Sequence, residues 1–420
     1  MRLLERDDDT GEFRLTKHLP TDTISEIPAY AILSHTWGEE EVLFKDLTDG
    51  TAKNKAGYAK IRFCGEQAER DGLKYFWVDT CCIDKSDAAE LQHALNSMFQ
   101  WYRNAAKCYV YLLEVSTRKR DADGKSKGEL SFQNCRWFTR GWTLQELIAP
   151  ATVEFFSRDG ERLGDKESLE REICGITGIP QRALRGSPLS DFSVAERMRW
   201  IEKRNTKYEE DKVYSLFGIF DVNMRLDYGE GKEKAFDRLR HKIDKNYQRL
   251  AKLWPADPRD PRDEKKRIEL AKGGLLADAY RWVFDNPDFN RWRQLSESRL
   301  LWIKGDPGKG KTMLLCGIIN ELERPVTVNG GNLAYFFCQA TDSRINNATA
   351  VLRGLIYLLV QRQPRLLSHL PENTYPSDDA MAWIVLSETF IEILADPNLK
   401  VTYLVIDALD ECVVDQQKLL

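Results

Sequence analysis

A glycine-rich octet in the second half of the chain places the strongest constraint on its fold. An apolar run at residues 300–303 leads into the octet, and residues 313–322 are predicted to continue as a helix. The octet fits the pattern G-x-x-x-x-G-K-[S/T], in which backbone N–H groups surround a phosphate at the start of a helix. Lys311 would reach the β- and γ-phosphates. The predicted phosphate-binding residues are Gly305, Asp306, Pro307, Gly308, Lys309, Gly310, Lys311 and Thr312.

A later hydrophobic segment supplies the acids that such a loop requires. Residues 401–406 read as a strand that ends in Asp407, so Asp407 and the Thr312 hydroxyl are predicted to hold a Mg²⁺ ion. Asp410 and Glu411 follow within one turn and are the candidates to orient or deprotonate an attacking water. The alternative is a glycine loop and an acidic strand end in an unrelated fold. The order and spacing of the two parts favour a P-loop NTPase site.

Strands and helices alternate at the beginning of the chain. The apolar patterns predict strands at 28–38, 73–79 and 108–113, with helices at 55–70 and 88–104 between them. This order is typical of a doubly wound, parallel sheet. Ligands of such sheets bind beyond the carboxyl ends of the strands. The polar residues predicted to lie there are Ser34, His35, Asp79 and Asp84.

A short helix predicted at residues 142–148 carries the most chemically informative pair in this region. The i,i+4 spacing places Trp142 and Glu146 on one helix face, which would combine a stacking platform with an acid. In the alternative interpretation, Glu146 pairs with an arginine such as Arg140 at the helix surface, and Trp142 belongs to the core. Both interpretations remain open at the level of sequence.

A thiol nucleophile is a second reading of the same region. Cys81 or Cys82 would act with His35 and an aspartate, since the members of such a triad meet in space and not in sequence. Free cysteines are, however, more often small buried hydrophobic residues.

Composition excludes several classes of protein. With 420 residues, 42% of them hydrophobic and 30% charged, the chain is long enough for two or three cores. A net charge of −4 gives no attraction to nucleic acid or to an anionic membrane. The nine cysteines form no C-x-x-C pair, which disfavours a zinc site and suits a reducing compartment. No apolar run approaches the roughly 18 residues of a membrane span, so we expect a cytoplasmic protein without a transmembrane segment.

Three blocks of the first 220 residues resemble the fungal heterokaryon incompatibility (HET) domain, namely YAILSHTWG, YFWVDTCCIDK and RGWTLQELIAP. HET domains look like TIR domains, many of which hydrolyse NAD⁺ with a glutamate in a W-C-x-x-E helix. The run from Trp142 to Glu146 is similar to that helix, with Thr143 in place of the cysteine. The resemblance implies a TIR-like or flavodoxin-like parallel sheet, with NAD⁺ as a substrate and Glu146 as the catalytic residue.

The second half of the chain resembles the NACHT family of STAND-type NTPases through GDPGKGKT and LVIDALDEC. The resemblance implies a P-loop α/β domain that binds ATP or GTP with Mg²⁺, in which Asp410 and Glu411 are catalytic. It also implies an NLR-like protein that self-associates through both domains in response to an activating ligand or partner protein. The expected outcome is programmed cell death during vegetative incompatibility. The alternatives are an NAD⁺-consuming enzyme and an NTPase fragment that does not signal.

These assignments divide the chain into three parts. Residues 1–247 form the HET domain with its C-terminal helices, 248–298 form a linker and helical lead-in, and 299–420 form the NACHT domain. A charged stretch with three prolines at 254–263 marks the boundary, and a charged insert at 116–128 is predicted to be a surface loop. The lead-in either packs near the nucleotide base or is an ordinary pair of interdomain helices. Because the sequence ends soon after Glu411, we expect a truncated domain with weak or absent turnover.

Overall fold

The protein folds as two compact units, Met1–Ile243 and Asp244–Leu420, each with its own hydrophobic core. The structure is a computed structural model that describes residues 1–7, 10–19, 27–116, 132–253, 260–276, 280–294, 299–329, 331–371 and 379–419, without the side chains of 324–329 and 379. The division falls within helix α10 (Lys232–Leu253), near the boundary predicted at residue 247. Most of the predicted insert at 116–128 and of the proline-containing stretch at 254–263 lies outside the described residues.

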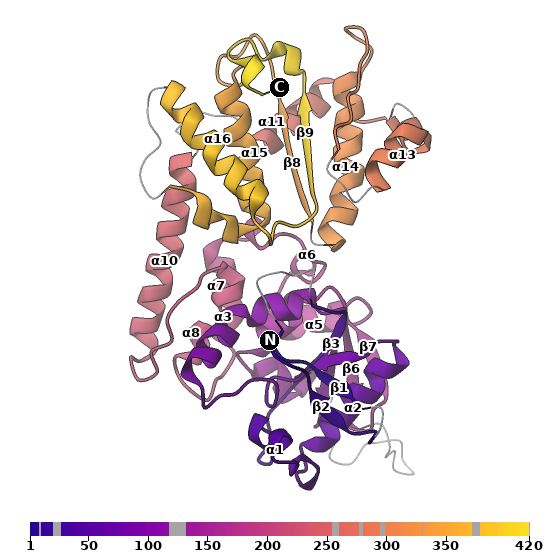
Figure 1. Cartoon of the computed structure of the whole chain (residues 1–420), viewed down its shortest axis with the longest axis vertical. Helices are drawn as coiled ribbons and strands as arrows, with labels where there is room; N and C mark the ends of the chain where they lie inside the picture. Colours follow the sequence, from indigo (N-terminus) through magenta and orange to yellow (C-terminus); the bar gives the residue numbers. More distant parts are fainter. Residues whose placement is uncertain are drawn as a thin grey trace. The chain divides into compact units, whose positions relative to one another are not determined.

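A seven-stranded sheet organises the first unit (Figure 1). Its strand order is β2-β1-β4-β3-β5-β6-β7, with β4, β3, β5 and β6 parallel and the outer pairs antiparallel. The strands are β1 (Leu4–Arg6), β2 (Phe13–Leu15), β3 (Tyr30–His35), β4 (Tyr75–Trp77), β5 (Lys107–Leu112), β6 (Val153–Ser157) and β7 (Arg162–Asp165). The predicted α/β fold with a mainly parallel sheet is confirmed.

The central strand β3 is buried along its whole length. This is the burial expected of a parallel strand that is covered on both faces, and it explains the continuous apolar run before Ser34. Helix α2 (Tyr58–Arg70) packs against β3 and β4, and helix α4 (Thr143–Ile148) packs against β3. Helix α3 (Ala88–Asn104) packs against α4.

The order of the strands creates a switch point beside β3. The connection through α2 leads from β3 to β4 on one side, whereas the connection through α3 leads to β5 on the other side. The connections that leave the carboxyl ends of β3 and β5 therefore run to opposite sides, and open α/β sheets bind their ligands at such a point. Ser34 and His35 close β3 at this edge, and Asp79 follows β4.

Further helices complete the first unit. After the sheet, the chain forms α5 (Glu170–Thr177), α6 (Gln181–Leu184), α7 (Val194–Glu202), α8 (Asp211–Tyr214) and α9 (Phe217–Phe220), while α1 (Phe44–Thr48) precedes α2. Helix α9 packs against α3. The polar segment between α7 and α8 reaches the start of α4, because Gly141 N–H donates to the carbonyl of Asn205 over 2.9 Å. A Cβ at Gly141 would lie 2.3 Å from Thr206, so only glycine permits this close approach.

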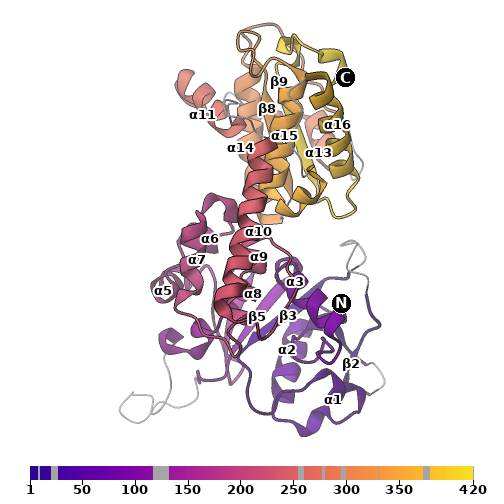
Figure 2. The ribbon, with the colours of Figure 1, turned by 90° about the vertical axis from the view of Figure 1, so that its left-hand side faces the viewer.

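The second unit is built around two parallel strands, β8 (Asn332–Phe337) and β9 (Thr402–Asp407). Helix α15 (Ala348–Arg362) packs on β8 and α14 (Lys311–Asn329) on both strands, while α16 (Asp379–Ala395) packs on α15. Figures 1 and 2 show α15 and α16 on one side of the strand pair and α14 on the other. The lead-in contains α11 (Pro261–Ala271), the short helix η6 (Arg281–Asp285) and α13 (Pro287–Gln294).

The strand predicted at residues 300–303 does not form. Leu300 is 83% exposed and Trp302 is 51% exposed, and the segment has no regular structure. A strand needs a neighbour for its N–H and C=O groups. Among the described residues of this unit, β8 and β9 pair only with each other. The apolar sequence alone therefore predicted the strand wrongly.

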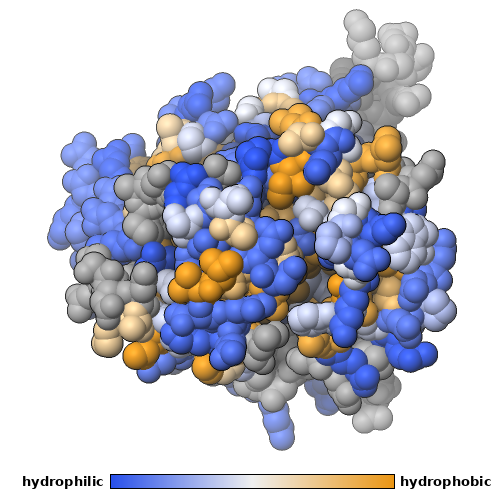
Figure 3. Space-filling model, turned by 90° about the horizontal axis from the view of Figure 1, so that it is seen from above, coloured by the Kyte–Doolittle hydropathy of each residue, from blue (hydrophilic) through white to orange (hydrophobic). Residues whose placement is uncertain are grey.

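Within the described ranges, none of the helices is long and apolar enough to cross a bilayer. On the face of the molecule seen in Figure 3, hydrophobic residues lie in small groups among hydrophilic ones. Exposed hydrophobic residues scattered in this way are normal for a folded protein.

Candidate functional sites

Glu146 reaches the end of β3 from helix α4. The Ser34 hydroxyl donates to Glu146 Oε2 over 2.5 Å, and the Trp137 indole N–H donates to Ser34 Oγ over 2.8 Å. All three side chains are buried, Glu146 with 7% exposure. The start of α4 is fixed because the Thr143 hydroxyl lies 2.6 Å from the carbonyl of Trp137. A hydrogen-bonded chain of indole, hydroxyl and carboxyl thus lies at the switch point of the sheet.

The environment of Glu146 favours its neutral form. Burial raises the pKa of Glu146 to about 8, although the hydrogen bond from Ser34 and the charges of Arg140 and Arg204 oppose this increase. The carboxyl group is therefore mainly protonated at neutral pH. A cationic group bound beside it would restore the ionised form, because an opposite charge lowers the pKa of an acid.

Asp79, at the end of the next strand, has the opposite character. Its Oδ1 lies 3.1 Å from His35 Nε2, and its Oδ2 accepts a 2.8 Å hydrogen bond from the Trp37 indole. Burial opposes ionisation, but the bond with His35 and the charge of Lys85 outweigh it and lower the pKa of Asp79 to about 2. One edge of the sheet therefore holds an ionised carboxylate and a protonated one. Such divergence between two carboxyl groups is typical of acid–base and glycosidic chemistry.

Trp142 and Glu146 share a helix face, but their side chains have different partners. The indole of Trp142 bonds to Asp211 on α8 and is only partly buried against the core. Glu146 makes no ion pair with Arg140 in the part of the chain that the structure describes. The aromatic partner of the Glu146 site is Trp137, to which sequence analysis gave no role. The contact arises from tertiary packing and has no local sequence pattern.

The other strand-end candidates have structural roles. Asp84 accepts a 2.6 Å hydrogen bond from the Ser86 hydroxyl in the turn before α3. Cys81 and Cys82 are buried, and burial raises the pKa of the Cys81 thiol well above its ordinary value. Because the thiolate is the nucleophile, this environment does not support a thiol mechanism.

Arg204 connects the start of α4 to a neighbouring cavity. Its Nη1 donates to the carbonyl of Arg140 over 2.9 Å and to the Thr143 hydroxyl over 2.8 Å. Burial lowers the pKa of Arg204 to about 10, and the charge of Glu146 opposes this change. Arg204 therefore positions α4 and supplies positive potential near Glu146.

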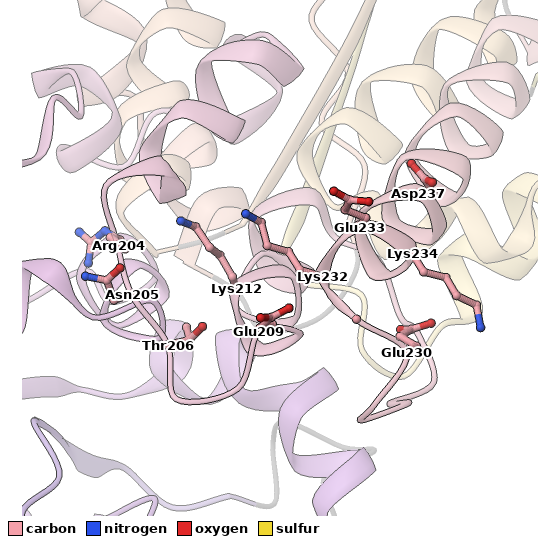
Figure 4. Close-up of a pocket in the computed structure, with 11 residues that line it drawn as sticks. Arg204, Asn205, Thr206, Glu209, Lys212, Glu230, Lys232, Glu233, Lys234 and Asp237 are labelled. Carbon is pink, nitrogen blue, oxygen red and sulfur yellow. The ribbon is translucent and has the colours of Figure 1, made fainter.

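The cavity beside Arg204 has a volume of about 820 Å³ and carries charges of both signs. Figure 4 shows Lys212 and Lys232 extending in the same direction into this region, with Glu209 below them. None of the residues predicted as catalytic or cofactor-binding lines it. The lining residues are Arg204, Asn205, Thr206, Glu209, Lys212, Glu230, Gly231, Lys232, Glu233, Lys234 and Asp237.

The predicted phosphate loop precedes helix α14, which begins at Lys311. Gly308 and Gly310 have φ angles of +78° and +82°, a conformation that residues with a Cβ rarely adopt. The Lys311 ammonium donates to the carbonyls of Gly305 and Asp306 over 2.6 and 3.1 Å. The loop thus curves around the amine that was predicted to contact phosphates.

The two predicted magnesium ligands lie together. Asp407 ends β9 with 5% exposure, and the Thr312 side chain at the start of α14 lies close to it. Burial raises the pKa of Asp407, and the nearby Thr312 hydroxyl opposes that increase. A carboxylate beside a hydroxyl is the kind of hard oxygen ligand set that Mg²⁺ prefers when phosphates supply further oxygens. These residues therefore fit the ion.

The two acids after β9 are held differently. The residue that follows Asp407, Ala408, has a φ of +50°, and a short helix (Leu409–Glu411) then turns the chain. Glu411 Oε2 accepts a 3.0 Å hydrogen bond from the backbone N–H of Ala340, beyond the end of β8. Asp410 and Glu411 are both exposed. The hydrogen bond from Ala340 fixes the side chain of Glu411.

The burial of Glu146 predicts a specific dependence of stability on pH. The ordinary pKa of 4.5 applies to the unfolded chain, whereas the folded value is about 8. The folded state therefore binds one more proton between these values, and stability falls as the pH rises through this window. Relative to Glu146→Gln, the wild type should lose up to about 1.4 kcal/mol of unfolding free energy per pH unit.

Urea unfolding of the full chain between pH 5 and 7.5 measures this difference. Glu170→Gln is the control, because Glu170 is also buried but pairs with Arg185 over 2.7 Å. A constant difference in stability between wild type and Glu146→Gln across this range would show that Glu146 is already ionised at pH 5.

Two families match separate parts of the chain. The family described as heterokaryon incompatibility protein (HET) matches residues 30–129, which include the ends of β3 and β4. The family described as nephrocystin 3, N-terminal, matches residues 278–420, which include the phosphate loop and Asp407. Helix α4 with Glu146 lies outside both matched segments. No solved structure matches the chain.

A curated relative is similar over the whole chain. The vegetative incompatibility protein HET-E-1 of Podospora anserina is 64% identical over 430 aligned residues, which cover 100% of this chain. The chain spans 31% of the length of that relative. The chain thus carries a HET domain followed by a NACHT-related domain of the nephrocystin 3 N-terminal family.

Proposed function

We propose that this chain forms the effector and switch parts of a fungal NLR-like protein that acts in vegetative incompatibility in the cytoplasm. In this proposal, ATP or GTP bound with Mg²⁺ in the second unit controls self-association, which brings HET domains together and leads to cell death. The identity with a protein named for vegetative incompatibility supports the biological role. The single observation that carries the switch is the position of Thr312 close enough to the Asp407 carboxyl group to lower its pKa, beside the phosphate loop.

Residues of the second unit have distinct roles in this proposal. Mg²⁺, when bound, would neutralise the charge that develops on the phosphates. Thr312 and Asp407 would hold the ion, and Lys311 would exchange its two backbone carbonyl partners for phosphate oxygens. Glu411, fixed by Ala340, would orient water. A nucleotide shifts the equilibrium between two arrangements only by its difference in affinity for them.

Replacing Lys311 by alanine should weaken nucleotide binding on the order of tenfold to a hundredfold, because charge-assisted hydrogen bonds to phosphate are lost. Lys304→Ala is the matched control, since it removes the same charge from an exposed lysine that precedes the predicted phosphate-binding residues. Its affinity should remain within about threefold of wild type. Calorimetric titration of the full chain with ATP or GTP and Mg²⁺ measures both. Equal losses in the two variants would argue against a specific role of Lys311.

We also propose a second activity, the cleavage of NAD⁺ by the first unit. The divergent protonation of Glu146 and Asp79 at the switch point favours it. The N-glycosidic bond would break with its electron pair leaving on nicotinamide, and water would add to the ribose carbon and release a proton. The positive charge of the substrate would favour ionised Glu146, which would then stabilise the cationic ribose. Ser34 and Trp137 would hold the carboxylate in position.

Glu146→Gln should abolish the release of nicotinamide from NAD⁺, because an amide cannot stabilise the cationic ribose as a carboxylate does. Chromatography of the full chain incubated with NAD⁺ under crowding measures the product. Glu170→Gln should retain the wild-type rate. Cell death caused by a wild-type chain that releases no nicotinamide would instead identify the HET domain as a binding module that signals by self-association.

A further inference from the structure

Trp37 presents an aromatic face at the carboxyl end of β3. Its side chain is 37% exposed, and its indole N–H is fixed by the 2.8 Å hydrogen bond to Asp79. Its backbone is fixed on both sides. The carbonyl of Thr36 accepts a 3.0 Å hydrogen bond from Lys60, and the carbonyl of Trp37 accepts one of 3.0 Å from Arg136. The ring is therefore a pre-organised surface with an ionised carboxylate at its edge.

A lysine of the same domain covers this ring. Lys85 Nζ lies 3.7 Å from the centroid of the Trp37 ring, which is the geometry of a cation–π contact. The negative groups that act on this ammonium are Asp79, Glu41 and Asp211. A tryptophan face beside an ionised aspartate is thus a site for a positive charge, and Lys85 supplies that charge.

The ammonium of Lys85 is poorly satisfied in this position. Its nitrogen is buried and has no hydrogen-bond partner among the described residues. Lys60, close by, shows the contrasting case, since its ammonium contacts His35 Nδ1, the Thr36 carbonyl and Glu41. A buried donor without an acceptor is unfavourable, and burial also lowers the pKa of Lys85. The cation–π contact with Trp37 therefore offsets only part of the cost of removing the Lys85 ammonium from water. Moving Lys85 into water would remove that cost.

We propose that the Trp37 face is a binding site for a planar organic cation, which displaces Lys85 and stacks on the indole beside Asp79. A flat ring matches the face, and its positive charge replaces that of the ammonium next to the carboxylate. The oxidised nicotinamide ring is such a cation, so the inference deepens the proposed cleavage of NAD⁺ and rests on it for the identity of the ligand. Trp37 follows Ser34, the partner of Glu146, by three residues in the sequence.

Three tryptophans of the first unit could serve as the stacking surface, and their surroundings distinguish them. Trp142 was predicted as the stacking platform, but it is partly buried against the core. Trp137 is fully buried and donates to Ser34. Among these three tryptophans, Trp37 has the largest exposed fraction, and its ring already contacts a positive charge, that of Lys85. Trp37 is therefore assigned as a substrate-positioning residue, and Lys85 as the group that competes with the substrate.

The experiment measures binding of 1-methylnicotinamide, a planar cation methylated on the ring nitrogen and without a ribose bond to cleave, by saturation-transfer NMR titration of the full chain. Lys85→Ala should bind it about tenfold more tightly than wild type, since the competing cation is gone. Trp37→Leu should remove this gain when combined with Lys85→Ala. Trp37→Phe, which keeps a ring without the bond to Asp79, should have an intermediate affinity. It provides a second variant should Trp37→Leu fail to fold.

Lys74→Ala is the matched control. Lys74 Nζ lies 5.5 Å from the Tyr75 ring centroid on the same sheet, but it pairs with Glu5 and its side chain is 60% exposed. Its removal should leave the affinity unchanged. The proposal is overturned if Lys85→Ala binds no more tightly than wild type. It is also overturned if the double variant with Trp37→Leu keeps the gain, or if neutral nicotinamide binds Lys85→Ala as tightly as the cation.

The result separates the binding site from the reaction. Tight binding of the cation by Lys85→Ala without nicotinamide release from NAD⁺ would support the Trp37 site and contradict the proposed cleavage. The opposite result is also informative. If the wild type releases nicotinamide, and Trp37→Phe and Lys85→Ala have the same KM for NAD⁺ as the wild type, the cleavage is supported and the role of Trp37 is contradicted.

Discussion

Parallel pairing of buried strands is the interaction on which both units depend. Because parallel strands end at the same edge of a sheet, the polar residues that follow them meet there even when they are far apart in sequence. Ser34 and Asp79 are brought together in this way in the first unit. In the second unit, the pairing of β8 with β9 brings Asp407 beside the loop after Phe337, from which Ala340 holds Glu411.

The hydrogen-bond partners and nearby charges of the buried carboxyl groups at this edge of the first sheet set their protonation. Two carboxyl groups at one edge of the sheet differ in protonation, because Glu146 has a hydroxyl as its hydrogen-bond donor whereas Asp79 has His35 and a nearby ammonium. The difference in protonation depends on the fold, since the hydrogen-bond donors to the two carboxyl groups come from different segments of the chain. Lys85 and Arg204 supply positive charge without forming an ion pair with either acid among the described residues. In the proposal made above, a cationic ligand takes the place of Lys85 at this edge.

Sequence patterns predicted the elements well where the pattern is local. Helix α3 and the helix after the phosphate loop begin close to the predicted residues, β3 and β4 lie within the predicted ranges, and β5 begins one residue before its range. The strand at 300–303 was predicted wrongly, because a strand forms only where a neighbouring strand can pair with it, and an apolar run does not show whether such a neighbour exists. The hydrogen-bonded neighbours of Glu146 could not be predicted from the sequence either. Ser34 and Trp137 come from segments separated by about a hundred residues, and packing alone joins them.

In the proposed function, a nucleotide held between the phosphate loop and Asp407 controls the assembly of the chain. Light scattering coupled to gel filtration measures this directly as the molar mass of the full chain with and without Mg²⁺ and ATP or GTP. We expect the nucleotide to shift the wild-type chain to a larger assembly. An identical molar mass under both conditions, in a chain that calorimetry shows to have bound the nucleotide, would contradict it.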